Sequence, residues 1–153
     1  MTSKIKPAVE RRYPVDPQRS ILAGLSLGGL FDAYVLFHQP DAFAGYVVMS
    51  PSLWWDNGLA FRWDEESVGR GRPLAARVYL SVGEKEETSS DDAGMVSNMK
   101  KLAARLAARG DPQLALRSEV LPGESHYSNF GAAFSCGLRF VLPPPPAPPP
   151  PPM

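Results

Sequence analysis

The chain has 153 residues, with 16 basic and 16 acidic side chains and therefore no formal net charge. This balance argues against nucleic acid or an anionic membrane as the main partner, because both are bound through basic surfaces. The single cysteine, Cys136, excludes an internal disulfide framework and a cysteine-based zinc site. No stretch of eighteen apolar residues is present, so no membrane span is predicted. The first residues lack the apolar run of a secretory signal, so the sequence as written predicts a cytoplasmic protein.

Proline is concentrated near the end of the chain, where nine of the 17 prolines lie within residues 143–152. Proline has no backbone N–H to donate, so residues 143–153 are expected to be a disordered polyproline II tail. The folded domain is therefore predicted to span residues 1–142. Such a tail is either inert or a ligand for a polyproline-recognising domain, and the inert interpretation is favoured.

Apolar periodicity divides the folded region into alternating strands and helices. This alternation predicts an α/β domain with a mostly parallel sheet of about four strands flanked by helices. In chain order, the sequence predicts a helix over 6–12, a strand over 20–24, a helix over 26–38, a strand over 44–49, a tryptophan-rich stretch over 52–72 that is irregular or holds a short helix, a strand over 76–82, a helix over 92–109 capped by Asp91 or Asp92, a strand over 113–121 and a helix over 129–142.

The segment Gly24-Leu25-Ser26-Leu27-Gly28 matches the G-x-S-x-G nucleophile elbow. A predicted buried strand precedes it and a predicted apolar helix follows it, which is the context that this motif requires. The sharp turn would hold the Ser26 hydroxyl out at the carboxyl edge of the sheet, and the backbone N–H of Leu27 would face a developing oxyanion. The competing interpretation is a glycine-rich turn with an incidental serine.

A serine nucleophile needs a base, and the chain offers two histidines. His38 ends the helix that Ser26 begins, and a rise of about 1.5 Å per residue would place it roughly 18 Å away. His126 follows the last predicted strand and therefore lies at the same sheet edge as Ser26. His126 is the predicted base, although a lone loop histidine is more often a surface residue.

The base in turn needs a carboxylate to orient it. The third predicted strand ends in Gly83-Glu84-Lys85-Glu86-Glu87, again at the same edge. Glu86 is the first choice, Glu84 the second and Glu87 the third, while a solvated acidic turn is the alternative for each. The order serine, acid, histidine is that of the α/β-hydrolases.

These segments resemble the putative esterase family of α/β-hydrolases, which includes esterase D and the esterases that open ferric siderophore trilactones. The resemblance covers roughly residues 5–142 and is carried by YPVD at 13–16, AGLSLGGL at 23–30, MSPSLWWD at 49–56, SVGEKE at 81–86 and PGESH at 122–126. It implies ester hydrolysis without metal or organic cofactor, with Ser26 as nucleophile and His126 as base. It also implies that Trp54 and Trp55 lie near the substrate pocket. By contrast, generic packing is the expectation for Trp63.

The sequence departs from this family in two respects. Leu25 stands where the siderophore-esterase branch often has histidine. The elbow also begins at residue 24, whereas in a whole α/β-hydrolase it follows the fifth strand. The chain therefore corresponds to the C-terminal half of the fold and lacks the N-terminal strands and the loop that supplies a second oxyanion donor. A longer relative could be exported, since any signal would lie in the part not represented here.

Three functional hypotheses follow. The first is a serine hydrolase that cleaves carboxylic esters, including siderophore-type esters, and the second is an acyltransferase on the same fold. The third is a catalytically impaired or inactive fragment that acts as an interaction module, since the loss of one oxyanion donor costs on the order of 10²–10³ in turnover. The strand over residues 20–24 would have an open edge, so self-association through it, pairing with a separate fragment or poor solubility is also expected.

Overall fold

The computed structural model describes residues 3–87 and 94–142. Helices and strands alternate along the described chain, as the periodicity predicts. In chain order these elements are α1 (Ile5–Arg12), the 3₁₀ turn η1 (Pro17–Arg19), β1 (Ile21–Leu25), α2 (Leu27–His38), the 3₁₀ turn η2 (Pro40–Ala42), β2 (Gly45–Met49), α3 (Trp55–Gly69), β3 (Arg77–Gly83), the 3₁₀ turn η3 (Glu84–Glu86), α4 (Met95–Ala108), β4 (Ala115–Leu121) and α5 (Phe130–Val141).

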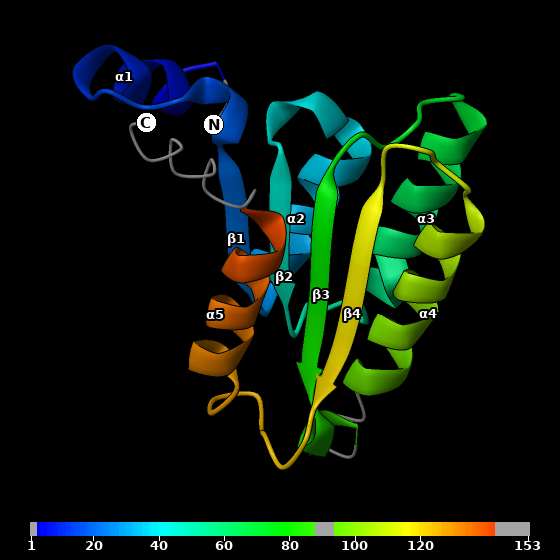
Figure 1. The fold of residues 1–153 in the computed structure, drawn as a ribbon. Helices are drawn as coiled ribbons and strands as arrows, with labels where there is room; N and C mark the ends of the chain where they lie inside the picture. Colours follow the sequence, from blue (N-terminus) through cyan, green and yellow to red (C-terminus); the bar gives the residue numbers. More distant parts are fainter. Residues whose placement is uncertain (1–2, 88–93, 143–153) are drawn as a thin grey trace, which may run out of the picture.

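The four strands form one parallel sheet in the order β1-β2-β3-β4. Helices α2, α3 and α4 connect successive strands and lie on one face of the sheet, while α5 crosses the other face (Figure 1). This arrangement follows the right-handed crossover rule for parallel strands. Because all four strands run the same way, their carboxyl ends meet at one edge, which is the lower edge in Figure 1.

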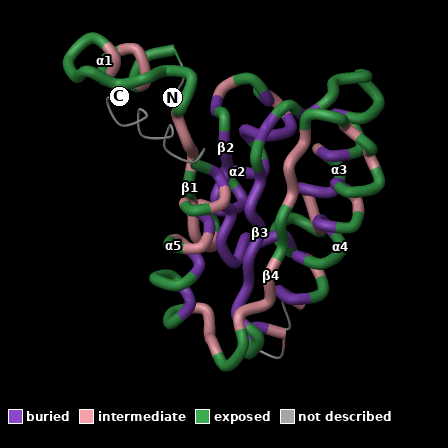
Figure 2. Tube along the Cα trace, viewed as in Figure 1, coloured by how far each residue is buried: buried purple, intermediate pink, exposed green. Residues whose placement is uncertain are grey.

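The core consists of two apolar layers separated by the sheet. Tyr46, Val48, Val78 and Leu80 face the layer formed with α2, α3 and α4. Val47, Met49 and Tyr79 alternate with them and face α5. Every residue of β2 is buried, and Figure 2 shows β2 and β3 as the most deeply buried part of the molecule. Strands covered on both faces read as continuous apolar runs, which is the pattern in the sequence.

The stretch over residues 52–72, predicted to be irregular or to hold a short helix, contains the 15-residue helix α3 (Trp55–Gly69), so the prediction underestimated its helical part. The first turn explains why, because Asp56, Asn57 and Gly58 all have positive φ angles. Asp, Asn and Gly tolerate this conformation and are poor helix formers. They therefore give the sequence a loop-like pattern at the point where the helix starts. Tertiary packing buries Phe61 and Asp64 of this helix and so stabilises it.

The other predicted boundaries agree with the structure to within a few residues. The helix predicted over 92–109 is observed as α4, and its proposed caps Asp91 and Asp92 lie outside the described residues. The tail over residues 143–153 also lies outside the described residues.

The two edges of the sheet differ in chemistry. Edge strand β4 carries Arg117 and Glu119, whereas edge strand β1 has the uncharged sequence ILAGL. Next to β1, helix α1 has no buried residue, and Ile5 remains 60% exposed. Charged side chains are the usual protection of a sheet edge, so β4 is protected in this way and β1 is not.

Candidate active site

The turn between β1 and α2 has the geometry of a nucleophile elbow. Ser26 has φ 61° and ψ −119°, a conformation that non-glycine residues rarely adopt. Its N–H donates to the Met49 carbonyl at 3.0 Å, and its own carbonyl accepts from Leu30 N–H at 3.0 Å and from Ser52 N–H at 3.1 Å. These three hydrogen bonds hold the strained residue between the ends of two strands.

Gly24 is required by the same turn. A Cβ at this position would lie 2.3 Å from the carbonyl carbon of Gly28, so no side chain fits where α2 approaches β1. The close approach brings the first turn of α2 directly behind Ser26. Leu27 begins this helix, and the first N–H groups of a helix have no partner within it. The Leu27 N–H is therefore free of intrahelical bonding, as an oxyanion donor must be.

The Ser26 hydroxyl lies next to a second serine. Its Oγ is 3.3 Å from Ser52 Oγ, and either hydroxyl can donate. Among the described residues, this is the one side-chain hydrogen bond of Ser26, and His126 is not its partner. Ser52 is buried and follows β2, so the ends of β1 and β2 jointly position the nucleophile candidate.

His126 pairs with Glu86. The Glu86 Oε2 to His126 Nδ1 distance is 2.6 Å, and Glu86 is 2% exposed. Glu86 comes from the turn after β3 and His126 from the loop after β4, so the parallel sheet brings together residues that lie far apart in the sequence. With Nδ1 bound to the carboxylate, Nε2 is the ring nitrogen left to exchange a proton.

The Glu86 carboxylate is held by three further donors. Its Oε1 accepts from Gly83 N–H at 2.6 Å, Ser50 Oγ at 2.7 Å and Asn129 Nδ2 at 2.8 Å. Gly83 must lack a side chain here, because a Cβ would lie 2.8 Å from Glu86 Oε1 and 2.6 Å from the Glu124 carbonyl oxygen. A carboxylate with this many donors is fixed in position and can orient a histidine.

The two other acidic candidates have different partners. Glu84 Oε2 accepts from Gly123 N–H at 2.8 Å, and Glu87 Oε2 accepts from Ser97 N–H at 2.8 Å. These bonds tie the turn after β3 to the loop after β4 and to α4. The hydrogen bonds to Ser97 hold the pKa of Glu87 below its ordinary value. Neither carboxylate has a hydrogen bond to a histidine in the described chain.

Sequence reasoning missed Ser50, Ser52 and Asn129. Ser50 and Asn129 are buried and also bond each other, with 3.0 Å between Asn129 Nδ2 and Ser50 Oγ. Ser50 and Ser52 directly follow β2, and Asn129 precedes α5. A search for every polar residue just beyond a predicted strand would have found the two serines, whereas Asn129 carries no local signal.

Trp54 and Trp55 also follow β2 at the carboxyl edge of the sheet. They are 41% and 47% exposed, and their ring centroids lie 5.8 Å apart. Trp63, in contrast, packs partly buried against the core and makes an edge contact with Tyr34 at 5.2 Å. His38 belongs to that same aromatic group, and its Nδ1 lies 2.9 Å from the Tyr34 carbonyl oxygen, so it is not part of the Ser26 region.

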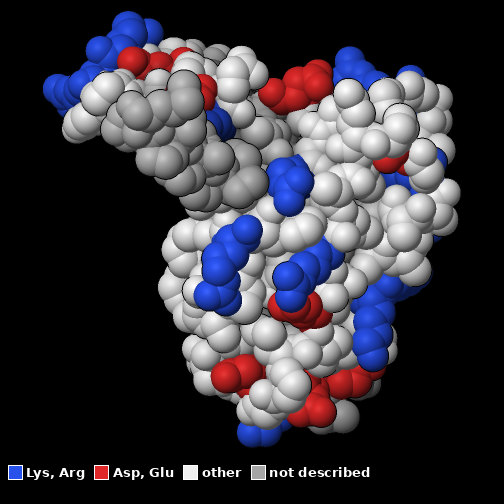
Figure 3. Space-filling view, in the orientation of Figure 1, with Lys and Arg blue, Asp and Glu red and all other residues white. Residues whose placement is uncertain are grey.

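The surface shows no single dominant charge on the face in Figure 3, where basic and acidic side chains are interspersed among uncharged ones. Within residues 3–87 and 94–142, no three His, Cys, Asp or Glu side chains group in a way that could hold a metal ion. Over the same residues, no helix has the length and apolar character needed to cross a membrane.

Comparisons with known proteins identify the family of this chain. A family model described as putative esterase matches residues 1–141. The chain is 33% identical over 142 residues to the ferri-bacillibactin esterase BesA of Bacillus subtilis, covering 90% of this chain and 48% of that protein. It is 29% identical over 160 residues to a siderophore enterobactin esterase of Emericella nidulans, covering 90% of this chain and 52% of the relative.

Solved structures show the same relation. The siderophore hydrolase EstA from Aspergillus nidulans superposes with a TM-score of 0.83 at 27% identity, over 92% of this chain and 53% of that one. The BES protein from Bacillus cereus gives a TM-score of 0.82 at 30% identity, over 92% and 52% of the two chains. The chain thus spans about half the length of each of these four relatives.

Proposed function

Because this chain belongs to the putative esterase family, we propose that it is a serine hydrolase that cleaves carboxylic esters. The observation that carries the proposal is the convergence of Ser26, Glu86 and His126 on one sheet edge, with the Glu86 carboxylate 2.6 Å from His126 Nδ1. The same arrangement of roles recurs in serine hydrolases on unrelated folds, so it is supported by chemistry as well as by descent.

In the proposed mechanism, His126 Nε2 accepts the proton of the Ser26 hydroxyl as its Oγ attacks the ester carbonyl. The Leu27 N–H donates to the oxyanion, and Glu86 holds the His126 ring and stabilises its charged form. The alcohol leaves with the proton from His126. Water, activated by the same histidine, then attacks the acyl-enzyme and releases the acid. No metal or organic cofactor takes part in these steps.

The proposed substrate class is siderophore-type esters, since relatives that match most of this chain are named for hydrolysis of ferri-bacillibactin and enterobactin. Trp54 and Trp55 support a pocket role, because they leave large aromatic surface exposed beside the strand ends. Aromatic rings in such a position can stack on aryl groups of a ligand.

Two alternatives remain from the sequence. An acyltransferase would use the same residues and differ in the acceptor, so product analysis with an added alcohol separates it from a hydrolase. A catalytically impaired or inactive fragment that serves as an interaction module would show no ester hydrolysis, so an activity assay separates it from a hydrolase. The expected self-association through residues 20–24 belongs to this second alternative.

The deciding experiment is hydrolysis of p-nitrophenyl acetate and butyrate by the purified chain and by Ser26→Ala. The hydrolase proposal predicts turnover that falls to background in the variant, because no other hydroxyl can replace the elbow serine in its strained position. Ser52→Ala is the matched control, since it removes the neighbouring hydroxyl and leaves the nucleophile. Turnover that persists fully in Ser26→Ala would contradict the proposal, and an inactive parent chain would favour the interaction module.

A further inference from the structure

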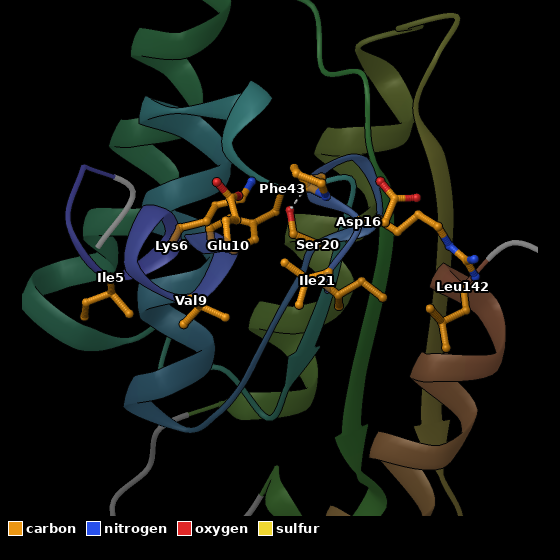
Figure 4. Close-up of a pocket in the computed structure, with 12 residues that line it drawn as sticks. Ile5, Lys6, Val9, Glu10, Asp16, Ser20, Ile21, Phe43 and Leu142 are labelled. Carbon is orange, nitrogen blue, oxygen red and sulfur yellow. Dashed lines mark hydrogen bonds between the residues drawn. The ribbon is translucent and has the colours of Figure 1, made fainter. Parts of the chain in front are cut away.

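The apolar groove beside α1 lies at the opposite end of the sheet from the candidate active site. It has a volume of about 540 Å³ and is lined by residues that include Ile5 of α1 and Ile21 at the beginning of β1 (Figure 4). These residues lie at the amino ends of the strands, whereas Ser26, Glu86 and His126 follow their carboxyl ends (Figure 1). A residue that contacts the candidate triad must therefore come from the carboxyl edge.

Asn129 lies at that edge, in the N-cap position of α5, but it does not cap the helix. Asparagine is a preferred N-cap residue because its side-chain oxygen accepts a hydrogen bond from the first turn. No such side-chain bond is formed here, and Asn129 Oδ1 is buried without a hydrogen-bond partner among the described residues. A buried oxygen without a partner costs free energy, so other contacts must fix the orientation of this amide.

The amide nitrogen of Asn129 accounts for this orientation. Nδ2 lies 2.8 Å from Glu86 Oε1, 2.8 Å from the Ser125 carbonyl oxygen and 3.0 Å from Ser50 Oγ. The two hydrogens of the amide can therefore be donated to the carboxylate and to the loop carbonyl. If the amide turned over, Oδ1 would face these same two oxygens, and both are acceptors. The surroundings thus favour the orientation in which the nitrogen faces the acid.

These contacts join the segments that carry the acid and the base. Glu86 belongs to the turn after β3, and Ser125 directly precedes His126 in the loop after β4. The Ser125 carbonyl accepts twice from Asn129, from Nδ2 and from the main-chain N–H at 3.2 Å. Ser50 adds the end of β2, and its φ of 38° is one that non-glycine residues rarely adopt. Asn129 therefore contacts three segments whose placement sets the distance between Glu86 and His126.

We propose that Asn129 is a positioning residue of the candidate active site, which holds Glu86 and His126 together through the two hydrogens of its side-chain amide. Because Asn129 is 0% exposed, it acts through these two residues and not on the substrate. Its charge-assisted bond to Oε1 leaves Oε2 for the His126 ring, and its bond to Ser125 fixes the loop that carries this ring. The consequence for catalysis rests on the proposed hydrolase function, whereas the positioning is measurable without activity.

Nuclear magnetic resonance of the histidine rings tests the positioning directly. At about pH 8, above the range in which histidine ordinarily titrates, the parent should carry the His126 ring proton on Nδ1 and exchange it slowly. Asn129→Ala should lose this single tautomer and exchange the proton about ten- to a hundredfold faster, as expected for the loss of a hydrogen bond to a charged group. His38 should keep its signals in both proteins and serves as the internal reference. Unchanged His126 signals in Asn129→Ala would overturn the proposal.

Asn129→Asp separates positioning from helix capping. Aspartate caps helices as well as asparagine does, so a purely structural role predicts that this variant matches the parent. A carboxyl group offers at most one hydrogen where the amide offers two, and its charge would face Glu86. Positioning therefore predicts the same change in the His126 signals as in Asn129→Ala. Signals like those of the parent would leave Asn129 with a capping role only and overturn the proposal.

Ser128→Ala is the matched control for the loop. Ser128 is exposed, and its Oγ accepts from Ser125 N–H at 2.9 Å. The substitution therefore removes a hydrogen bond to the same loop residue and leaves the amide of Asn129 in place. The His126 signals and kcat of this variant should stay close to those of the parent. Loss of the single tautomer in Ser128→Ala as well would show that general loop loosening, and not the amide, controls the ring.

Kinetics with p-nitrophenyl esters give the second readout. In Asn129→Ala and Asn129→Asp, kcat should fall about ten- to a hundredfold while KM changes less than about twofold, because a buried residue removes no substrate contact. Unchanged kcat together with unchanged His126 signals would overturn the positioning and leave the hydrolase proposal intact. An inactive parent would count against the hydrolase proposal alone, and the ring signals would still decide the positioning.

The parent protein provides a test that does not depend on how the variants fold. Its Asn129 side-chain amide should exchange with solvent at least about tenfold more slowly than that of Asn57, which is exposed. Circular dichroism identifies any variant that does not fold, and the exchange rates of the parent then decide. Equal rates for the two amides would overturn the proposal, because an amide that holds the acid and the loop cannot be open to water.

Discussion

Ser26 combines a strained backbone with three main-chain hydrogen bonds that hold it in place. A non-glycine residue in such a conformation costs on the order of 1–3 kcal/mol, and it persists where the surroundings impose it. The Glu86 carboxylate shows the same principle for a side chain, since three donors occupy Oε1 and leave Oε2 for His126. Both groups are positioned in advance, which is how a catalytic site avoids reorganising during reaction.

Glu86→Gln should lower kcat for p-nitrophenyl esters by about 10²–10⁴ while the protein stays folded. The amide group would present either its oxygen or its NH₂ to His126 Nδ1, and an NH₂ there favours the tautomer that cannot accept the Ser26 proton. Glu84→Gln is the matched control, because its carboxylate bonds Gly123 N–H instead. Its kcat should stay close to that of the parent. Equal losses in both variants would contradict the assignment of Glu86 as the triad acid.

Helix α2 and strand β1 depend on each other through the glycines at their junction. The helix begins so close to the strand that Gly24 has no room for a Cβ, whereas a Cβ on Gly28 would meet nothing within 4 Å. The two glycines of the motif therefore differ in role. Gly24 permits the close approach, whereas Gly28 is the second residue of the helix and has open space around it.

Gly24→Ala should destabilise the protein by about 1–3 kcal/mol and displace the elbow, because the new methyl group collides with backbone rather than with a flexible side chain. Gly28→Ala should leave the stability unchanged or raise it by up to about 1 kcal/mol, since alanine is the better helix former. Urea denaturation followed by circular dichroism measures both. If Gly28→Ala were the more damaging substitution, the close contact inferred at Gly24 would be wrong.

In the described part of the domain, one buried carboxyl group lacks a counter-charge. Asp32 of α2 is 1% exposed, and its Oδ2 has no hydrogen-bond partner among the described residues. Burial raises the pKa of Asp32 from 3.8 to about 8, and a hydrogen bond from the Gly24 backbone offsets only part of this rise. The phenol of Tyr46 is also buried, and burial together with the nearby Asp32 raises the pKa of Tyr46 as well. The native state therefore holds a proton on Asp32 that the unfolded chain releases at neutral pH.

This raised pKa predicts the direction in which stability changes with pH. Between about pH 4 and pH 8 the native state binds more protons at Asp32 than the unfolded state, so this group's contribution is complete below pH 4 and is lost as the pH rises. One pKa unit corresponds to about 1.4 kcal/mol, so the total loss is on the order of a few kcal/mol. Asp32→Asn cannot ionise, and its free energy of unfolding relative to the parent should therefore increase across this interval. A constant difference between the two proteins in urea denaturation would show that Asp32 does not carry the proton.

The α/β class, the strands and the elbow could be predicted from sequence because they depend on local signals. Apolar runs of strand length, the glycines around Ser26 and the polar residues after each strand all lie within a few positions of one another. The start of α3 escaped prediction, because Asp56, Asn57 and Gly58 suggest a loop while Phe61 and Asp64 are held by distant partners. The sequence pattern of a turn and that of a helix start with positive φ angles are alike, and only the packing of the following residues distinguishes them.

The sequence by itself determined that Ser26, an acidic residue after the third strand and His126 would reach one edge of a parallel sheet, since parallel strands end on the same side. It did not determine which glutamate would face His126, because Glu84, Glu86 and Glu87 are neighbours whose directions depend on the turn that carries them. Tertiary structure decided this, by placing Ser50 and Asn129 from two other segments around Glu86 and leaving Glu84 to Gly123. These contacts join residues 36 to 43 positions apart and leave no pattern in the chain, so only the folded molecule shows them.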